Sequence, residues 1–246
     1  MIGCGASAAW FRHEIGRVTP VDRPSPNHAL RPDGAGVDVL VLHYTELPLE
    51  ESLRVLTDAT RPLRVSSHYV LAEDGTVYRL VPEDRVAWHA GISYWRGRER
   101  LNQTSIGIEI VNLDGDRHDY PPQQVAALIE LCRGIMARHP GIVPRNVVGH
   151  SDIAPQRKVD PGRRFPWAAL AAAGIGLWPR AGRRPIDGKI QPALQRFGYV
   201  PPLAVPPREI VNAFHSLYRP AQVDGMPDAE TLGLLGALLD QVKNEV

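Results

Sequence analysis

The sequence predicts an α/β domain, in which a mixed β-sheet is flanked by helices, followed by a small C-terminal domain of three helices. Strand-like apolar runs alternate with helical periodicity between about residues 30 and 176. Beyond Trp178 the pattern changes, because a basic stretch and two Pro-Pro pairs separate three short helical patterns. A chain of 246 residues with 43% hydrophobic content can also bury a sizeable core.

Three segments follow from these patterns. Residues 1–35 are punctuated by Pro, Arg and Gly without a sustained period, which predicts an extended N-terminal lead-in. Residues 36–177 form the predicted α/β domain, and residues 178–246 form the predicted helical domain. Its helices are expected near Ile190 to Phe197, Arg208 to Tyr218 and Asp228 to Val242.

The first half of the α/β domain contains three predicted strands and a short helix. The β-branched run at 37–44 is typical of a strand that is covered on both faces, and it carries His43 near its end. A short helix is expected around Leu49 to Asp58. The runs Val65 to Ala72 and Thr76 to Val81 flank an Asp-Gly pair at 74–75, which predicts a β-hairpin.

The second half continues the alternation of strands and helices. Residues 105–111 predict another buried strand, with Glu109 in its middle, and a carboxylate at such a position needs a reason. Pro121 to His139 is the clearest helix, with Pro at its start and Cys132 on its apolar face. Asn146 to His150 predicts a short strand that ends in a second histidine.

Charge and cysteine content narrow the class of protein. The chain has 28 Lys+Arg against 27 Asp+Glu, so no net field recruits nucleic acid or an anionic membrane. With only two cysteines, one of them on a predicted buried helix face, a disulfide framework is excluded. No transmembrane run or signal peptide is found, which predicts a cytoplasmic protein as encoded. The alternative is a periplasmic, outer-membrane lipoprotein, because Met1-Ile2-Gly3-Cys4 is similar to the end of a lipoprotein cleavage box.

Two histidines and an aspartate form a candidate metal site. Hydrolytic zinc sites use three protein ligands and leave a fourth position for water. His43 and His150 both end predicted strands, where open α/β sheets carry their sites, and Asp160 follows ten residues after His150. Spacing alone is a weak signal among nine histidines, each of which could equally be a hydrogen-bonded core or surface residue.

Six ordered segments strengthen this interpretation, because together they resemble the N-acetylmuramoyl-L-alanine amidase type 2 family of peptidoglycan amidases over about residues 37–178. The segments are Val41-Leu42-His43-Tyr44-Thr45, Ser66-Ser67-His68-Tyr69, Leu80-Val81-Pro82-Glu83, Ala87-Trp88-His89-Ala90-Gly91-Ile92-Ser93, the run 101–109, and the run 150–162.

The resemblance implies that His43, His150 and Asp160 bind one zinc ion per chain. It also implies an enzyme that hydrolyses the amide between N-acetylmuramic acid, or its anhydro form, and L-Ala of the stem peptide. Its partners would be peptidoglycan or muropeptide fragments, in recycling or turnover. Glu109 is the expected general base, and Lys158, on the same side of an extended segment as Asp160, is expected to stabilise the oxyanion.

Each role has a simpler alternative. Glu109 could be a buried carboxylate paired with an arginine, and Lys158 could be a solvated loop lysine. His68 is the main competitor as a ligand, but a structural role near the site is favoured for it. We expect Trp88, His89 and Asn102 to contact substrate, although Trp88 and His89 could also be packing residues.

In residues 194–199, 211–220 and 224–231, the C-terminal segment resembles a three-helix peptidoglycan-binding module. A helical pack that only stabilises the catalytic domain remains the alternative.

Other functions compete as well. A non-catalytic peptidoglycan-recognition module would lack a ligand, and a zinc peptidase would need a different pattern around its second histidine. The sequence leaves open the preference for anhydro sugar, the choice between polymeric and soluble substrate, and the oligomeric state.

Overall fold

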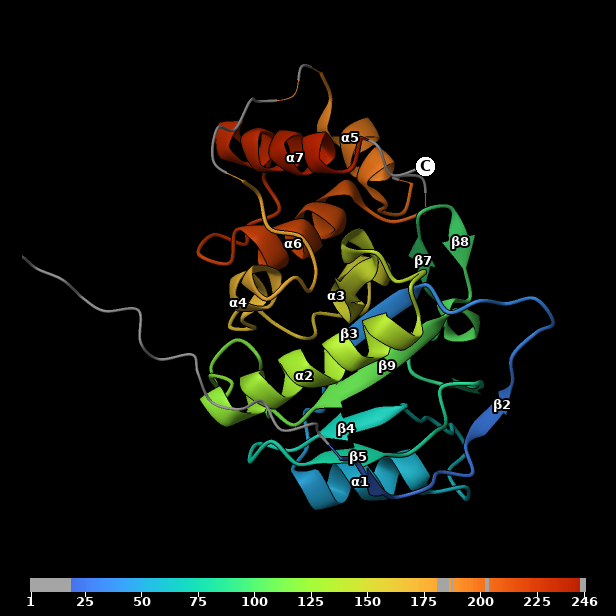
Figure 1. Cartoon of the computed structure of the whole chain (residues 1–246). Coiled ribbons are helices and arrows are strands. Elements are labelled where there is room, and N and C mark those ends of the chain that lie inside the picture. Colours follow the sequence, from blue (N-terminus) through green and yellow to red (C-terminus); the bar gives the residue numbers. More distant parts are fainter. Residues whose placement is uncertain (1–18, 181–185, 187, 202–203, 244–246) are drawn as a thin grey trace, which may run out of the picture.

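A mixed sheet with helices on both faces forms the larger part of the molecule, and three helices pack at one end of it (Figure 1). The computed structural model describes residues 19–180, 186, 188–201 and 204–243. Cys4, which carried the lipoprotein alternative, lies outside these residues. Within the described ranges, no helix is both long and apolar enough to cross a membrane.

The central sheet has six strands in the order β1-β5-β4-β9-β3-β10. Neighbouring strands are parallel, except that β4 and β5 are antiparallel. These two strands form the hairpin that the Asp-Gly pair predicts, and Gly75 adopts the left-handed φ of 91° that its turn requires. The strands are β1 (Val21–Asp22), β3 (Val39–Tyr44), β4 (Tyr69–Leu71), β5 (Val77–Arg79), β9 (Ser105–Ile110) and β10 (Val147–Gly149).

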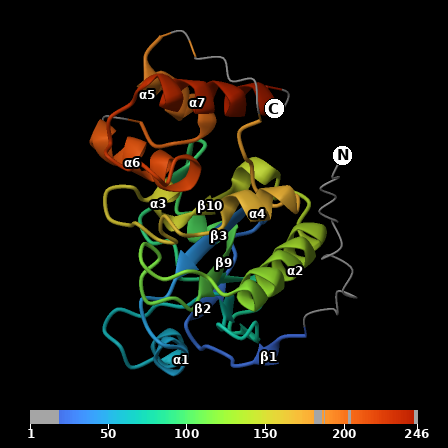
Figure 2. The same cartoon turned by 90° about the vertical axis from the view of Figure 1, so that its left-hand side faces the viewer.

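Two helices cover opposite faces of this sheet. Along β4, Tyr69 and Leu71 join the core beneath α2 (Pro122–Arg138), whereas Val70 joins the smaller core beneath α1 (Leu49–Thr57). This is the alternation that a strand imposes on its side chains. Figure 2 shows α2 running along β3 and β9. The face beneath α1 is the one that matters for the site described below.

The predicted lead-in is not separate from the domain. Its described part contributes β1, which pairs with β5, and β2 (His28–Leu30), which pairs with β6 (Arg85–Ala87). The polar loop at 88–102 contains a second hairpin, β7 (Tyr94–Trp95) with β8 (Arg98–Glu99). These strands have two or three residues each, which is too short for a period to show in the sequence.

The second predicted histidine strand needs a correction. Strand β10 ends at Gly149, and His150 is the first residue of the short helix α3 (His150–Ile153). The Asp152 carboxylate accepts a hydrogen bond from the Gly149 N–H at 2.8 Å and so begins the helix there. Two 3₁₀ turns, η1 (Leu101–Gln103) and η2 (Pro144–Asn146), and helix α4 (Trp167–Ala172) complete this part.

The C-terminal helices follow the sequence prediction closely. They are α5 (Ile190–Phe197), α6 (Pro207–Tyr218) and α7 (Ala229–Gln241). One continuous hydrophobic core runs from beneath α2 into these helices, and at its centre Trp95 of β7 contacts Phe197 and Tyr199 edge to face. The two predicted domains are therefore distinct in sequence pattern but share one core.

Candidate metal centre

His43 and Glu109 lie side by side on the face of the sheet beneath α1. Strands β3 and β9 are parallel, and their register pairs His43 with Glu109 and Val41 with Gly107. Paired residues in neighbouring strands project to the same face. Val70 of β4 pairs with Glu109 and belongs to the core beneath α1, which identifies this face.

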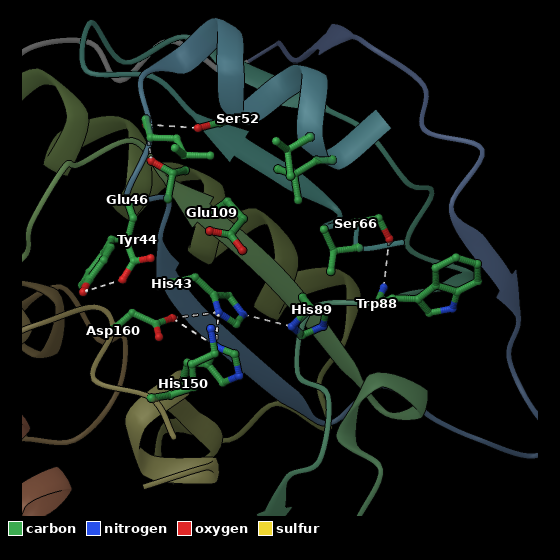
Figure 3. Close-up of a pocket in the computed structure, with 16 residues that line it drawn as sticks. His43, Tyr44, Glu46, Ser52, Ser66, Trp88, His89, Glu109, His150 and Asp160 are labelled. Atoms are coloured by element: carbon green, nitrogen blue, oxygen red, sulfur yellow. Dashed lines mark hydrogen bonds and ion pairs between the residues drawn. The ribbon is translucent and has the colours of Figure 1, made fainter. Parts of the chain in front are cut away.

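His150 and Asp160 approach His43 from the neighbouring edge of the sheet. Strand β10 pairs with β3, so helix α3 begins beside the end of β3. The chain then returns, and the Ser151 N–H donates to the Asp160 carbonyl oxygen at 2.9 Å. This hydrogen bond fixes the spacing of the loop between the two ligand candidates. All three side chains point to one spot in Figure 3.

Three atoms that can bind a metal meet at that spot. His43 Nδ1 lies 2.9 Å from His150 Nδ1, and each of these nitrogens lies 3.1 Å from Oδ2 of Asp160. The three side chains are buried, with between 1% and 6% of their residue surface exposed. Among the described residues, they form the single group of His, Cys, Asp or Glu side chains that could hold a metal ion.

The hydrogen bonds around these atoms fit a cation. His150 Nε2 lies 3.2 Å from the Ala90 carbonyl oxygen, which can only accept, and 3.4 Å from the Arg157 guanidinium, which can only donate. With the nearer carbonyl oxygen as its partner, Nε2 carries the proton and Nδ1 presents a lone pair. Lone pairs and a carboxylate that face one another repel unless a positive charge lies between them. Zinc bonds of about 2.0–2.2 Å place tetrahedral ligand atoms roughly 3.3–3.6 Å apart, close to the spacing found here. Two imidazoles and one carboxylate are also a known donor set for catalytic zinc.

The pKa of His43 agrees with this protonation. Burial, together with the neighbouring His150, lowers the pKa of His43 to about 4, so the ring is neutral at pH 7. Burial alone would raise the pKa of Asp160, but contact with His150 and His43 outweighs it and holds the pKa well below its ordinary value. His43 is therefore a neutral imidazole and Asp160 a carboxylate.

A cavity of about 190 Å³ opens beside the three ligand candidates, and Glu109 and Lys158 both line it. Burial and the Asp160 charge raise the pKa of Glu109 well above its ordinary value, and the Lys158 ammonium opposes this shift. The other residues of the wall are His43, Tyr44, Thr45, Glu46, Leu47, Ser52, Val55, Leu56, Val65, Ser66, Trp88, His89, His150 and Asp160.

The remaining predicted site residues occupy different positions. Trp88 lines the cavity, with the Arg64 guanidinium 5.1 Å above its ring. His89 lines it too but is only 8% exposed. Asn102 is not among the lining residues, because its Oδ1 accepts hydrogen bonds from the backbone N–H groups of His89 and Ala90. Substrate contact by these three residues stays a prediction.

His68, the competing ligand candidate, is fully buried away from the three ligand atoms. Its Nδ1 accepts from the Gly107 N–H at 3.0 Å, and its Nε2 donates to the Arg85 carbonyl oxygen at 3.1 Å. Both ring nitrogens are thus used to hold the backbone around β9. The structural role that the sequence favoured agrees with this position.

Sequence reasoning gave no role to several polar residues of the cavity wall, among them Tyr44 and Glu46. The Tyr44 hydroxyl donates to Glu46 at 3.3 Å, and both side chains face the cavity (Figure 3). Glu46 has a φ of 58°, an unusual conformation for a residue other than glycine. Tyr44 directly follows His43 and lies in the first of the family-like segments, and these two signals could have suggested it.

Comparison with known proteins gives a consistent result. Residues 33–163 match the N-acetylmuramoyl-L-alanine amidase family. The chain is 42% identical over 234 residues to N-acetylmuramoyl-L-alanine amidase AmiD of Escherichia coli strain K12, and the match covers 83% of each protein. It is also 38% identical to 1,6-anhydro-N-acetylmuramyl-L-alanine amidase AmpD of Citrobacter freundii, over 61% of this chain and 87% of that relative.

Solved structures show the same similarity. The complex of Escherichia coli AmiD with anhydro-N-acetylmuramic acid-L-Ala-D-gamma-Glu-L-Lys has a TM-score of 0.75 at 41% identity, and covers 86% of this chain and 92% of that one. AmpDh3 from Pseudomonas aeruginosa has a TM-score of 0.78 at 36% identity, covering 86% and 95%. These matches extend over more of the chain than the match to AmpD, which covers about three fifths of it.

Proposed function

This chain belongs to the N-acetylmuramoyl-L-alanine amidase family, and on that basis we propose that it is a zinc enzyme that cleaves muropeptides. The bond hydrolysed joins the lactyl group of N-acetylmuramic acid, or its 1,6-anhydro form, to L-Ala of the stem peptide. One observation carries this proposal. The ligand atoms of His43, His150 and Asp160 converge beside a cavity that Glu109 and Lys158 also line.

The three ligand candidates would hold the metal through His43 Nδ1, His150 Nδ1 and an Asp160 carboxylate oxygen. When bound in such a site, zinc polarises the carbonyl oxygen of the scissile amide and lowers the pKa of a water to about 7. These three protein ligands would leave room for a water beside the cavity, as is usual for catalytic zinc sites.

Glu109 is the proposed general base. Its carboxylate accepts the proton of the attacking water and later delivers that proton to the leaving amine of L-Ala. A pKa raised by burial suits this second step, since the protonated carboxyl group is then stable long enough to donate. Lys158 keeps a positive charge near the same carboxylate and limits how far the pKa rises.

Lys158 is proposed to stabilise the oxyanion that forms on the scissile carbonyl. It is partly buried and lines the cavity two residues before Asp160. A single donor to an oxyanion typically contributes about 3–4 kcal/mol to catalysis. This contribution arises where charge develops, so it should affect turnover more than substrate binding.

Support for the substrate comes from the relatives. AmiD of Escherichia coli was solved with an anhydromuramyl tripeptide, and AmpDh3 of Pseudomonas aeruginosa with an anhydromuramic pentapeptide. We propose the same class of ligand, an N-acetylmuramyl or anhydromuramyl peptide, for this chain. Trp88 and the neighbouring polar wall are candidates to contact its sugar or peptide.

Two measurements test the proposal directly. Purified protein should contain about one zinc per chain by elemental analysis. Mass spectrometry of muropeptides after incubation with zinc-loaded protein should show free stem peptide and the matching peptide-free sugar. Intact muropeptides would contradict the amidase function, and they would leave the non-catalytic recognition module as the better interpretation.

Glu109→Gln tests the assigned base. The variant keeps the shape of the side chain but cannot accept the proton, so we expect kcat to fall by roughly 10²–10⁴-fold. Zinc content should stay at the parent value, because Glu109 is not one of the three ligand candidates. Turnover close to that of the parent would remove Glu109 from this role.

A digest of intact sacculi alongside soluble anhydro-muropeptides would separate envelope remodelling from recycling. The C-terminal helices enter this question, since their similarity to a peptidoglycan-binding module predicts affinity for polymer. Co-sedimentation of the full chain with insoluble peptidoglycan measures that affinity. A protein that cuts soluble fragments but does not co-sediment would favour a stabilising role for these helices.

A further inference from the structure

Behind the candidate metal centre, a line of hydrogen bonds joins His43 to the start of β9. His43 Nε2 lies 3.0 Å from His89 Nδ1, and His89 Nε2 lies 3.1 Å from Ser105 Oγ. Ser105 Oγ in turn lies 2.6 Å from the Leu101 carbonyl oxygen. All three side chains are buried, with at most 8% of their surface exposed. Figure 3 shows the first of these contacts.

The far end of the line fixes the direction of every proton in it. A carbonyl oxygen can only accept, so the short contact to Leu101 requires the Ser105 hydroxyl to donate there. Ser105 Oγ can then only accept from His89, and His89 Nε2 must be the protonated nitrogen. A neutral imidazole has one donor and one acceptor, so His89 Nδ1 accepts.

The near end of the line then determines the tautomer of His43. Because His89 Nδ1 accepts, His43 Nε2 must carry the proton. Its Nδ1 therefore presents a lone pair to His150 and Asp160. His150 reaches the same state through the Ala90 carbonyl oxygen, so the two histidines are set by two separate acceptors.

From this line of hydrogen bonds, we infer that His89 and Ser105 position His43 for metal binding by holding it in the Nε2-protonated tautomer. The inference rests on the proposed metal site but not on the amidase reaction. It gives His89 a role other than substrate contact, since neither ring nitrogen is left to reach a ligand in the cavity.

Packing supports the same role. The His89 ring lies directly over Gly107 of β9, where an added Cβ would come within 2.5 Å of Cγ of the ring. Gly107 pairs with Val41, two residues before His43 on the same face of the sheet. Glycine at this position therefore leaves the space in which His89 stands against His43.

The experiment measures zinc affinity of the metal-free full chain by competition with a chromogenic chelator. Residues that orient a metal-binding histidine typically change affinity by about 10–100-fold when they are removed. We expect a loss in that range for His89→Ala and a smaller one for Ser105→Ala. Gly107→Ala should give a loss as well, because it displaces the ring without removing it.

Two variants serve as matched tests. His89→Asn can place an amide oxygen near the position of Nδ1, whereas His89→Gln places its amide near Nε2, so Asn should retain more affinity than Gln. Ser25→Ala is the control for Ser105→Ala, because Ser25 is a buried serine whose hydroxyl donates to the Leu56 carbonyl oxygen, which is not part of the line. This control should bind zinc with the parent affinity.

A spectroscopic readout follows the tautomer itself. Long-range proton–nitrogen NMR of the metal-free parent should show His43 protonated at Nε2, and His89→Ala should populate the other tautomer. Thermal melting of each variant tests whether its fold is intact. If His89→Ala or Gly107→Ala does not melt cooperatively, the zinc affinity of Ser105→Ala decides the question.

The outcomes separate this inference from the proposed function. Parent protein that binds zinc while His89→Ala and Ser105→Ala bind it equally well would overturn the inference and leave the metal site standing. The same holds if His89→Ala raises KM for a muropeptide without changing zinc affinity, since that result assigns His89 to substrate. Parent protein that binds no zinc would instead overturn the metal site.

Discussion

At the ends of β3 and β10, buried polar atoms face one another, whereas at the junction with the C-terminal helices the facing groups are aromatic rings. Around His43, the contact with His89 has a donor, an acceptor and a direction, and it turns the lone pair of Nδ1 toward His150 and Asp160. At the junction, Trp95 packs edge to face with Tyr199 at 5.2 Å and with Phe197 at 6.1 Å between ring centroids.

This difference indicates what each region can do. Hydrogen bonds are directional, so the polar region can fix which nitrogen of a ring faces the cavity. Apolar burial is not directional and scales with area, so the junction contributes mainly stability. We therefore expect substitutions at the junction to lower the free energy of unfolding, and substitutions in the polar region to alter metal binding or turnover.

The largest expected effect is at the junction. Trp95 is 1% exposed, and Trp95→Ala should lower the free energy of unfolding by about 3–5 kcal/mol, because it leaves a large cavity between the sheet and the helices. Denaturant unfolding of the metal-free protein measures this loss. Trp95→Phe, which keeps a ring, is the milder control. Zinc affinity of Trp95→Ala is measured at a temperature where the variant is folded. If that affinity falls as well, the junction affects metal binding and the contrast between the two regions does not hold.

The matching change in the polar region is Lys158→Met. The side chain keeps much of its length but loses its charge, so kcat should fall by roughly 10²–10³-fold while the free energy of unfolding changes little. Steady-state kinetics on a muropeptide, with zinc content measured in parallel, tests this. Lys158→Arg keeps the positive charge and should recover part of the rate. A loss of rate accompanied by a large fall in the free energy of unfolding would give Lys158 a structural role instead.

The polar contacts of Glu83 offer a test by pH. Burial by itself would raise the pKa of Glu83, but hydrogen bonds from Arg138, Tyr69 and His139 outweigh it and hold the pKa at about 2, below the ordinary 4.5. A lowered pKa stabilises the fold above pH 4.5, and this contribution is lost as the pH falls toward 2.

Glu83→Gln should therefore remove a contribution of up to about 3 kcal/mol at neutral pH and flatten the acid limb of the stability curve. Unfolding measured between neutral and strongly acidic pH gives the result. The control is Glu130→Gln, because the Glu130 carboxylate is more exposed than that of Glu83 and its ion pair with Arg133 is worth little. A parent curve that is flat in acid would contradict the assigned ionisation of Glu83.

The smallest expected effect lies at a polar contact within the junction. The Tyr199 hydroxyl donates to Asp152 at 2.6 Å, and the other oxygen of Asp152 accepts from the Gly149 N–H just before His150. Tyr199→Phe should cost about 1–2 kcal/mol of stability without changing zinc affinity, because the bond to Gly149 remains.

Tyr218→Phe is its control, since Tyr218 is a buried tyrosine of the same cluster and is not a hydrogen-bond partner of Asp152. Denaturant unfolding and chelator competition are measured on both variants. A fall in zinc affinity confined to Tyr199→Phe would show that the C-terminal helices reach the ligands through Asp152, and the contrast between the two regions would then be wrong at this point.

The sequence alone predicts the strands and helices that have a clear local period. The apolar run before His43, the Asp-Gly hairpin, the helix 122–138 and the three C-terminal helices all lie close to their predicted ranges. Periodicity encodes these elements because each residue's exposure is set by its own strand or helix. The three ligand candidates also emerged from the sequence, through their position in motifs shared with a known family.

Tertiary structure alone decided which of these residues touch. His43 meets His150 across 107 residues of chain and His89 across 46, and Glu109 stands beside His43 only because β3 and β9 pair in one register. A shift of that register by one residue would turn Glu109 to the opposite face. The tautomer of His43, the strands of the lead-in and the core shared with the C-terminal helices likewise depend on contacts that no local pattern encodes.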